Sequence, residues 1–118
     1  MKYVEGFVVP VPKKNLAAYR RHSMQMSKVC RKHGAIEHVV TWADDVKPGK
    51  WTSFPQSVKL KPGETVVFAY TVFKSRAARD KAWKKIMNDP AVHKMMKTQM
   101  PFDGRRMFWG GFKSIVDD

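Results

Sequence analysis

The chain has one cysteine, Cys30, among its 118 residues, and no apolar run approaches the length of a membrane span. A lone cysteine excludes an internal disulfide and is typical of a reducing compartment. The first residues, MKYVEGFVVPVPKK, lack the small-residue cleavage site of a secretory signal. We therefore expect a cytoplasmic protein with no membrane segment, folded as a single domain over residues 1–118.

Acidic residues are also scarce, since 10 Asp and Glu stand against 23 Lys and Arg, and the net charge is +13. None occurs between Gly6 and Ile36. Such a balance favours a polyanionic partner, because Lys and Arg displace the counterions of phosphates. The alternative is that the basic residues simply form a solvated face, which is the more common role of clustered Lys and Arg. The nucleic-acid hypothesis assigns phosphate contacts to Arg20, Arg21, Lys28, Arg31 and Lys32.

Strand-forming and helix-forming segments alternate along the chain. Strands are predicted over residues 2–12, 35–46, 65–73 and 105–112, and the polar stretch between residues 47 and 64 is an excursion that is briefly extended at 57–60. A long helix should begin at the N-cap Asn15 and stop before Gly34. Ser75 should cap a second helix over residues 76–89, and a shorter helical piece should follow Pro90.

This β-α-β-β-α-β order predicts an α+β, ferredoxin-like fold, in which both helices cover one face of a four-stranded antiparallel sheet. The strands, however, are apolar on both faces. In the third strand, Phe68 and Tyr70 alternate with Ala69 and Phe73. Because a large exposed apolar face usually marks an interface, we predict a homodimer packed sheet to sheet.

Several stretches carry a resemblance to a known family: KYVEGFVVPVPK, WADDVKPGK, SRAARDKAWKKIMNDP and MPFDGRRMFWGGF. They resemble the YbaA-like family of small uncharacterised bacterial proteins, nearly end to end from residue 2 to about residue 118. The resemblance implies a dimeric α/β-barrel built of ferredoxin-like halves. Related dimeric barrels include cofactor-free monooxygenases, so a monooxygenase-like enzyme is one functional alternative, supported by fold analogy alone.

No metal site is predicted. Cys30 and His33 offer two ligands at most, whereas structural zinc takes four. His22 and His33 would lie ~16 Å apart along a helix and cannot share an ion. No cofactor is expected either. Cys30 falls on the buried helical stripe, where a thiol is usually inert, and Asp103 beside Gly104 is typical of a turn more than of catalysis.

A pocket between sheet and helices is the remaining candidate site. Its predicted lining is Tyr19, His22, Trp42 and Trp109, with His22 as the natural proton acceptor. The alternative is that these aromatic residues are simply core. The leading hypothesis is therefore a small homodimeric protein that binds a small organic ligand. Non-specific nucleic-acid binding and a monooxygenase-like activity remain the alternatives.

Overall fold

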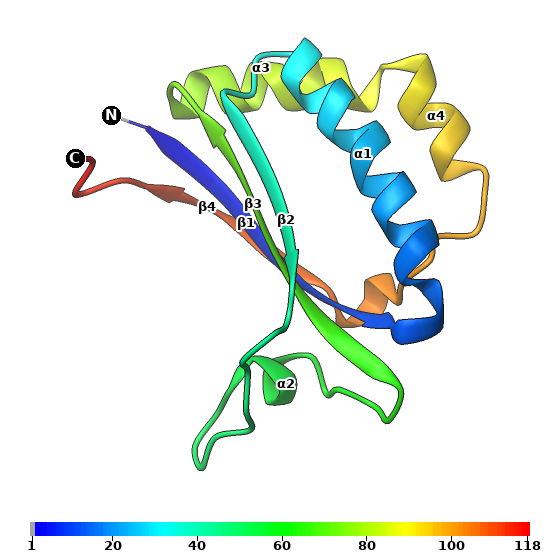
Figure 1. Cartoon of the computed structure of the whole chain (residues 1–118). Coiled ribbons are helices and arrows are strands. Elements are labelled where there is room, and N and C mark those ends of the chain that lie inside the picture. The colour runs from blue at the N-terminus through cyan, green and yellow to red at the C-terminus, as the bar shows by residue number, and fades with distance from the viewer. Residues whose placement is uncertain (1) are drawn as a thin grey trace.

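The computed structural model describes residues 2–118 of the chain. Its elements are β1 (Tyr3–Pro12), η1 (Lys13–Asn15), α1 (Leu16–Lys32), β2 (Glu37–Trp42), α2 (Phe54–Ser57), β3 (Glu64–Phe73), α3 (Arg76–Met87), α4 (Pro90–Met96), η2 (Gly104–Arg106) and β4 (Phe108–Lys113). Helices α1, α3 and α4 lie on one side of the sheet, and the short α2 belongs to an excursion at its lower end (Figure 1).

The four strands pair in the order β2-β3-β1-β4, and every pairing is antiparallel. The two long strands β1 and β3 form the centre, and the shorter β2 and β4 form the edges. This order, with two β-α-β halves, is the ferredoxin-like arrangement, so the predicted fold class is confirmed. Within residues 2–118, no helix combines the length and apolarity needed to cross a bilayer.

The helix ends follow from short local signals. Gly34 has a positive φ of 115° and ends α1, as predicted. The Ser75 hydroxyl accepts a hydrogen bond from the Ala78 N–H at 3.1 Å, which confirms the predicted cap of α3. Asn15 stands at the N-cap position of α1, yet its side chain donates to the Pro101 carbonyl and caps nothing. The preceding turn η1 already leads the backbone into the helix.

Two boundaries depart from the predictions. The sequence predicts an extended segment at residues 57–60, but the Ser53 hydroxyl caps the short helix α2, which Pro55 favours at its first turn. The last strand is predicted to begin at Arg105, but Gly104–Arg106 forms the turn η2 and β4 starts at Phe108. The Asp103 carboxylate accepts the Arg105 N–H and so holds this turn.

The helix-covered face of the sheet carries the core. Alternate residues of the two central strands point toward the helices, so Val9 pairs with Val67 and both are fully buried. Phe73 packs with Ala82 and Ile86 of α3 and with residues of α1 in one cluster. Side chains buried in this way each contribute roughly 1.5–3 kcal/mol of hydrophobic free energy.

The opposite face is covered only at one end, where Val58 of the excursion packs with Val8 and Val66 in a small buried cluster. The rest of this face has no cover among residues 2–118. Phe68 of β3 is 43% exposed and Phe112 of β4 is 65% exposed. Register places Val4, Gly6 and Val8 of β1 between them, because these residues pair with β3 on one side and β4 on the other. The prediction that both faces of the sheet are apolar is therefore confirmed, and we call this second surface the open face.

One ionic cluster fastens α3 to the sheet. Arg79 donates to the Glu5 carboxylate at 3.1 Å and to the Tyr3 hydroxyl at 3.2 Å, and its guanidinium lies over the Tyr3 ring. The Trp83 indole N–H donates to the other oxygen of Glu5. The Tyr3 ring in turn lies against the backbone of Gly111 on β4. A glycine is needed here, because the aromatic ring occupies the space of a side chain.

Replacing Gly111 with alanine should therefore lower the free energy of unfolding by about 1–3 kcal/mol, the usual cost of overpacking. The new Cβ would lie 2.7 and 2.8 Å from two carbons of the Tyr3 ring. Gly110→Ala is the matched control, because its Cβ would make an ordinary contact of 3.7 Å with Phe112. Urea denaturation measures both variants, and equal losses would contradict this account.

Asp89 joins the ends of three helices. It is buried; its Oδ2 lies 2.7 Å from Nε2 of His33 and 3.3 Å from Nζ of Lys32, and its Oδ1 accepts the Ala91 N–H at the start of α4. These hydrogen bonds lower the pKa of the Asp89 carboxyl from 3.8 to about 2, and the hydrogen bond with His33 has the largest effect.

A carboxyl whose pKa is lower in the folded state stabilises the fold above its unfolded pKa and loses that contribution as pH falls toward its folded value. We expect the Asp89 contribution to be complete at pH 7 and to decline between about pH 4 and pH 2. Asp89→Asn keeps a capping oxygen and removes the charge. Urea unfolding at pH 7 and pH 3 should show a smaller acid-induced loss in the variant than in the parent, whereas identical losses would contradict the prediction.

Candidate functional site

A groove of about 500 Å³ lies between α1 and the edge strand β2. Helix α1 supplies one wall and β2 the other, and the two run side by side in Figure 1. The residues that line the groove are Tyr19, Arg20, Ser23, Met24, Ser27, His38, Val40, Thr41 and Trp42. Apolar and aromatic walls with a few convergent polar groups are typical of small-molecule sites.

Both walls follow from sequence periodicity. On α1, Tyr19, Ser23 and Ser27 recur every four residues and so share one side of the helix. On β2, His38, Val40 and Trp42 alternate with their neighbours and pair with the helix-covered side of β3. Because β2 is an edge strand, no further strand closes the groove on its outer side.

The groove offers groups in defined protonation states. Burial raises the pKa of the Tyr19 hydroxyl to about 12, although a hydrogen bond with Ser23 opposes the shift. Burial lowers the pKa of His38, so this imidazole is neutral at pH 7. Arg20 is exposed at the groove and takes part in none of the ion pairs found within residues 2–118. The site therefore combines a phenol, a neutral imidazole and a free guanidinium.

The structure brings together only two of the four predicted ligand-binding residues. Tyr19 and Trp42 both line the groove. His22 is not among the groove residues, although its ring centroid lies 6.2 Å from that of Tyr19 and 5.8 Å from that of Phe102. Trp109 lies on β4, at the opposite edge of the sheet from Trp42. Trp109 is kept from the groove by the strand order, which separates the two edge strands by the whole width of the sheet.

His38 is the groove residue that the sequence analysis missed as a site. Its alternation with Val40 and Trp42 was visible in the sequence, and Trp42 was already a candidate. The missing information was that α1 packs beside β2, which makes His38, and not His22, the histidine of the groove. Arg20 was considered only as a phosphate contact. Its four-residue spacing from Met24 could have indicated that both residues lie on the same side of α1.

The residues of the nucleic-acid hypothesis all have exposed side chains on α1: Arg20, Arg21, Lys28, Arg31 and Lys32. Only Lys32 pairs with an acid, Asp89, at 3.3 Å within the described chain. No acidic residue stands on α1, and the outer surfaces of α3 and α4 add Lys81, Lys84 and Lys94. The helix layer is thus the basic side of the molecule, and binding of nucleic acid to it stays a prediction.

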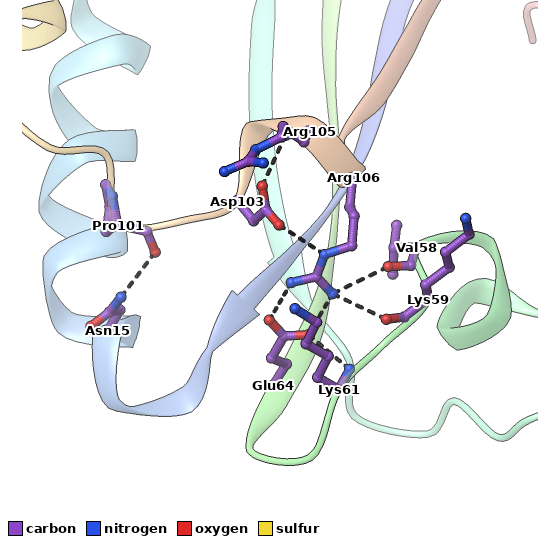
Figure 2. Close-up of polar contacts among 9 residues, drawn as sticks. All are labelled: Asn15, Val58, Lys59, Lys61, Glu64, Pro101, Asp103, Arg105 and Arg106. Atoms are coloured by element: carbon purple, nitrogen blue, oxygen red, sulfur yellow. Dashed lines mark hydrogen bonds and ion pairs between the residues drawn. The ribbon is translucent and has the colours of Figure 1, made fainter.

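The family-like stretch MPFDGRRMFWGGF, residues 100–112, holds the excursion against the sheet. Arg106 makes a bidentate pair with Glu64, at 2.7 and 2.6 Å, and donates to Asp103 at 2.9 Å (Figure 2). Its guanidinium also reaches the carbonyls of Val58 and Lys59 in the excursion (Figure 2). The guanidinium of Arg106 lowers the pKa of both carboxyl groups. Asp103 therefore positions a turn and a cation, as its Asp-Gly sequence indicated.

Two further candidates can be placed. Cys30 is buried, and burial raises the pKa of its thiol to about 11, so it carries no nucleophilic thiolate at neutral pH. Within residues 2–118, no three His, Cys, Asp or Glu side chains come close enough together to hold a metal ion.

A ferredoxin-like sheet with a groove under its first helix defines a small α+β protein with room for a modest ligand. The chain belongs to the family described as Protein of unknown function (DUF1428), whose model matches residues 2–104. It is 44% identical over 118 residues to the uncharacterized protein YbaA of Escherichia coli (strain K12) and equally to that of Shigella flexneri, and it covers 100% of both. The predicted family is confirmed.

Solved structures share the fold at low identity. Rv0793 from Mycobacterium tuberculosis is 14% identical, with a TM-score of 0.55 and coverage of 99% of this chain and 98% of that one. A putative antibiotic biosynthesis monooxygenase from Nitrosomonas europaea is 13% identical, with a TM-score of 0.55 and coverage of 97% and 90%. A mutant of SnoaB, a cofactor-independent oxygenase from Streptomyces nogalater, is 12% identical, with a TM-score of 0.55 and coverage of 98% and 95%. At these identities the likeness shows the fold alone.

Proposed function

We propose that this protein is a cytoplasmic homodimer that binds a small organic ligand in the groove between α1 and β2. The observation that carries the ligand proposal is the groove itself, about 500 Å³ in volume, with Tyr19, Val40 and Trp42 as walls and a few polar groups among them. A volume of this size falls within the range of ordinary small-molecule pockets. The single, buried Cys30 agrees with a reducing compartment.

The dimer proposal assigns a second copy to the open face. Most of the cations of the chain lie elsewhere, whereas Phe68, Phe108 and Phe112 of this face are exposed and uncharged. Two chains of net charge +13 repel each other, and a surface that lacks cations is where this repulsion opposes association least. An acidic partner would be attracted to the helix layer instead. Two sheets packed face to face, ~10 Å apart, would bury these aromatic side chains between them.

An oxygenase that uses no cofactor is a second candidate. Two solved structures with this fold carry oxygenase names, and the groove contains a histidine, His38, that is neutral at pH 7 and able to accept a proton. Such an activity needs a bound organic substrate, so the oxygenase hypothesis requires the same groove. A result that excludes ligand binding in the groove would also exclude this hypothesis.

Ligand binding is tested by a fragment screen on the 15N-labelled protein. We expect planar organic fragments at millimolar concentration to shift the backbone amide signals of residues 19–27 and 38–42. Ser27→Phe should abolish these shifts by filling the groove. Gln25→Phe is the control, because Gln25 is exposed on another side of α1. If no fragment moves these signals, or if both variants lose them equally, the groove is not a binding site.

Dimerisation is tested by sedimentation. The parent protein should sediment at micromolar concentration as twice the 13.6 kDa mass of one chain. Phe68→Asp should give monomers, because it buries an unpaired carboxylate in the proposed interface. Trp51→Asp is the control, since Trp51 is 86% exposed in the excursion outside the sheet. A parent protein that sediments as a monomer, or a Phe68→Asp variant that remains dimeric, would refute the proposed interface.

A further inference from the structure

The two walls of the groove run antiparallel, which fixes the order of its functional groups. Helix α1 ends at Lys32 and the chain turns directly into β2 at Glu37, so the end of β2 returns toward the start of α1 (Figure 1). Arg20 and Trp42 therefore lie at one end of the groove, and Ser27 and His38 lie at the other. At the rises of a helix and a strand, these ends are roughly 10–13 Å apart.

The middle of the groove is largely apolar. Met24 of α1 and Val40 of β2 lie there beside the hydroxyl of Ser23, and Tyr19 lies next to Arg20 at the Trp42 end. The indole of Trp42 is half exposed, which leaves aromatic surface free to contact a ligand. A flat apolar body could thus lie along the groove, in contact with Val40 and stacked on Trp42 at its end.

The end beside Trp42 carries the one guanidinium of the groove. Arg20 has no acidic partner among residues 2–118, and no Asp or Glu lines the groove. The fork of an arginine matches a carboxylate with two parallel hydrogen bonds. By contrast, phosphate groups are usually held by several donors together, often at a helix N-terminus, and this groove runs along the side of α1.

We propose that the ligand of this groove is a planar organic carboxylate, whose carboxylate binds Arg20 and whose apolar body stacks on Trp42. This assignment rests on the proposed function, because it gives a chemical class to the ligand of the same groove. Ser27 and His38 at the far end accept or donate a hydrogen bond to a polar substituent there.

Two probes of equal shape separate the class of ligand from the existence of the site. The probes are 2-naphthoate, a planar carboxylate, and 2-naphthamide, its uncharged counterpart, titrated by amide chemical shifts. We expect the protein to bind 2-naphthoate about tenfold more tightly, a difference of about 1.4 kcal/mol, because only the carboxylate forms a charge-assisted pair with Arg20. Arg20→Gln should remove this preference and leave the affinity for 2-naphthamide unchanged.

Arg21→Gln is the matched control, because it makes the same change of charge at the next residue, which is exposed and outside the groove. It should keep the preference for 2-naphthoate. Trp42→Leu should weaken both probes several-fold, whereas Trp51→Leu, in the excursion, should weaken neither.

The outcomes are distinguishable. If both probes bind the parent protein equally, or if Arg21→Gln loses as much preference as Arg20→Gln, the carboxylate class is wrong while the groove remains a binding site. If neither probe binds at millimolar concentration, the class is overturned together with the proposed function. Circular dichroism of each variant confirms that the fold is retained.

Discussion

Helices cover only one face of the sheet, so the apolar residues that alternate along its strands need two different neighbours. Val67, Ala69 and Phe73 of β3 find theirs in α1 and α3, and all three are buried. Phe68, on the same strand, is left exposed. This one-sided cover, which the order of two β-α-β halves imposes, creates both the open face and the groove at the edge of the helix layer.

Three of the ten acidic residues of the chain hold basic side chains inside the structure. Glu5 holds Arg79 of α3, Glu64 holds Arg106, and Asp89 holds His33 at the end of α1. Each of these carboxylates is at most partly exposed. Because these three carboxylates are turned inward and α1 carries no acidic residue, the outer surface of α1 is basic. This distribution agrees with the proposal that two like-charged copies meet through the open face.

Most of the fold was predictable because its signals are local: β-branched runs for the strands, Ser75 and Gly34 for the helix ends, and the order of elements for the topology. The predictions were wrong where contacts between residues far apart in the sequence determine the local structure. Asn15 donates to Pro101, 86 residues away, instead of capping its own helix. The candidate site was only half predicted for the same reason, since sequence spacing cannot show that α1 packs beside β2.

The groove and the open face lie on opposite sides of the sheet, so a ligand and a second copy would not compete for space. They are nevertheless connected through β2, where Val40 lines the groove, Val39 pairs with Tyr70 of the open face, and Thr41 both lines the groove and pairs with Phe68. Thr41 also bonds across to the carbonyl of Phe68, at 2.5 Å, which ties the groove strand to the centre of the open face. Among the elements of residues 2–118, β2 is the one that lines both surfaces, so it offers the shortest route for any coupling between dimerisation and ligand affinity.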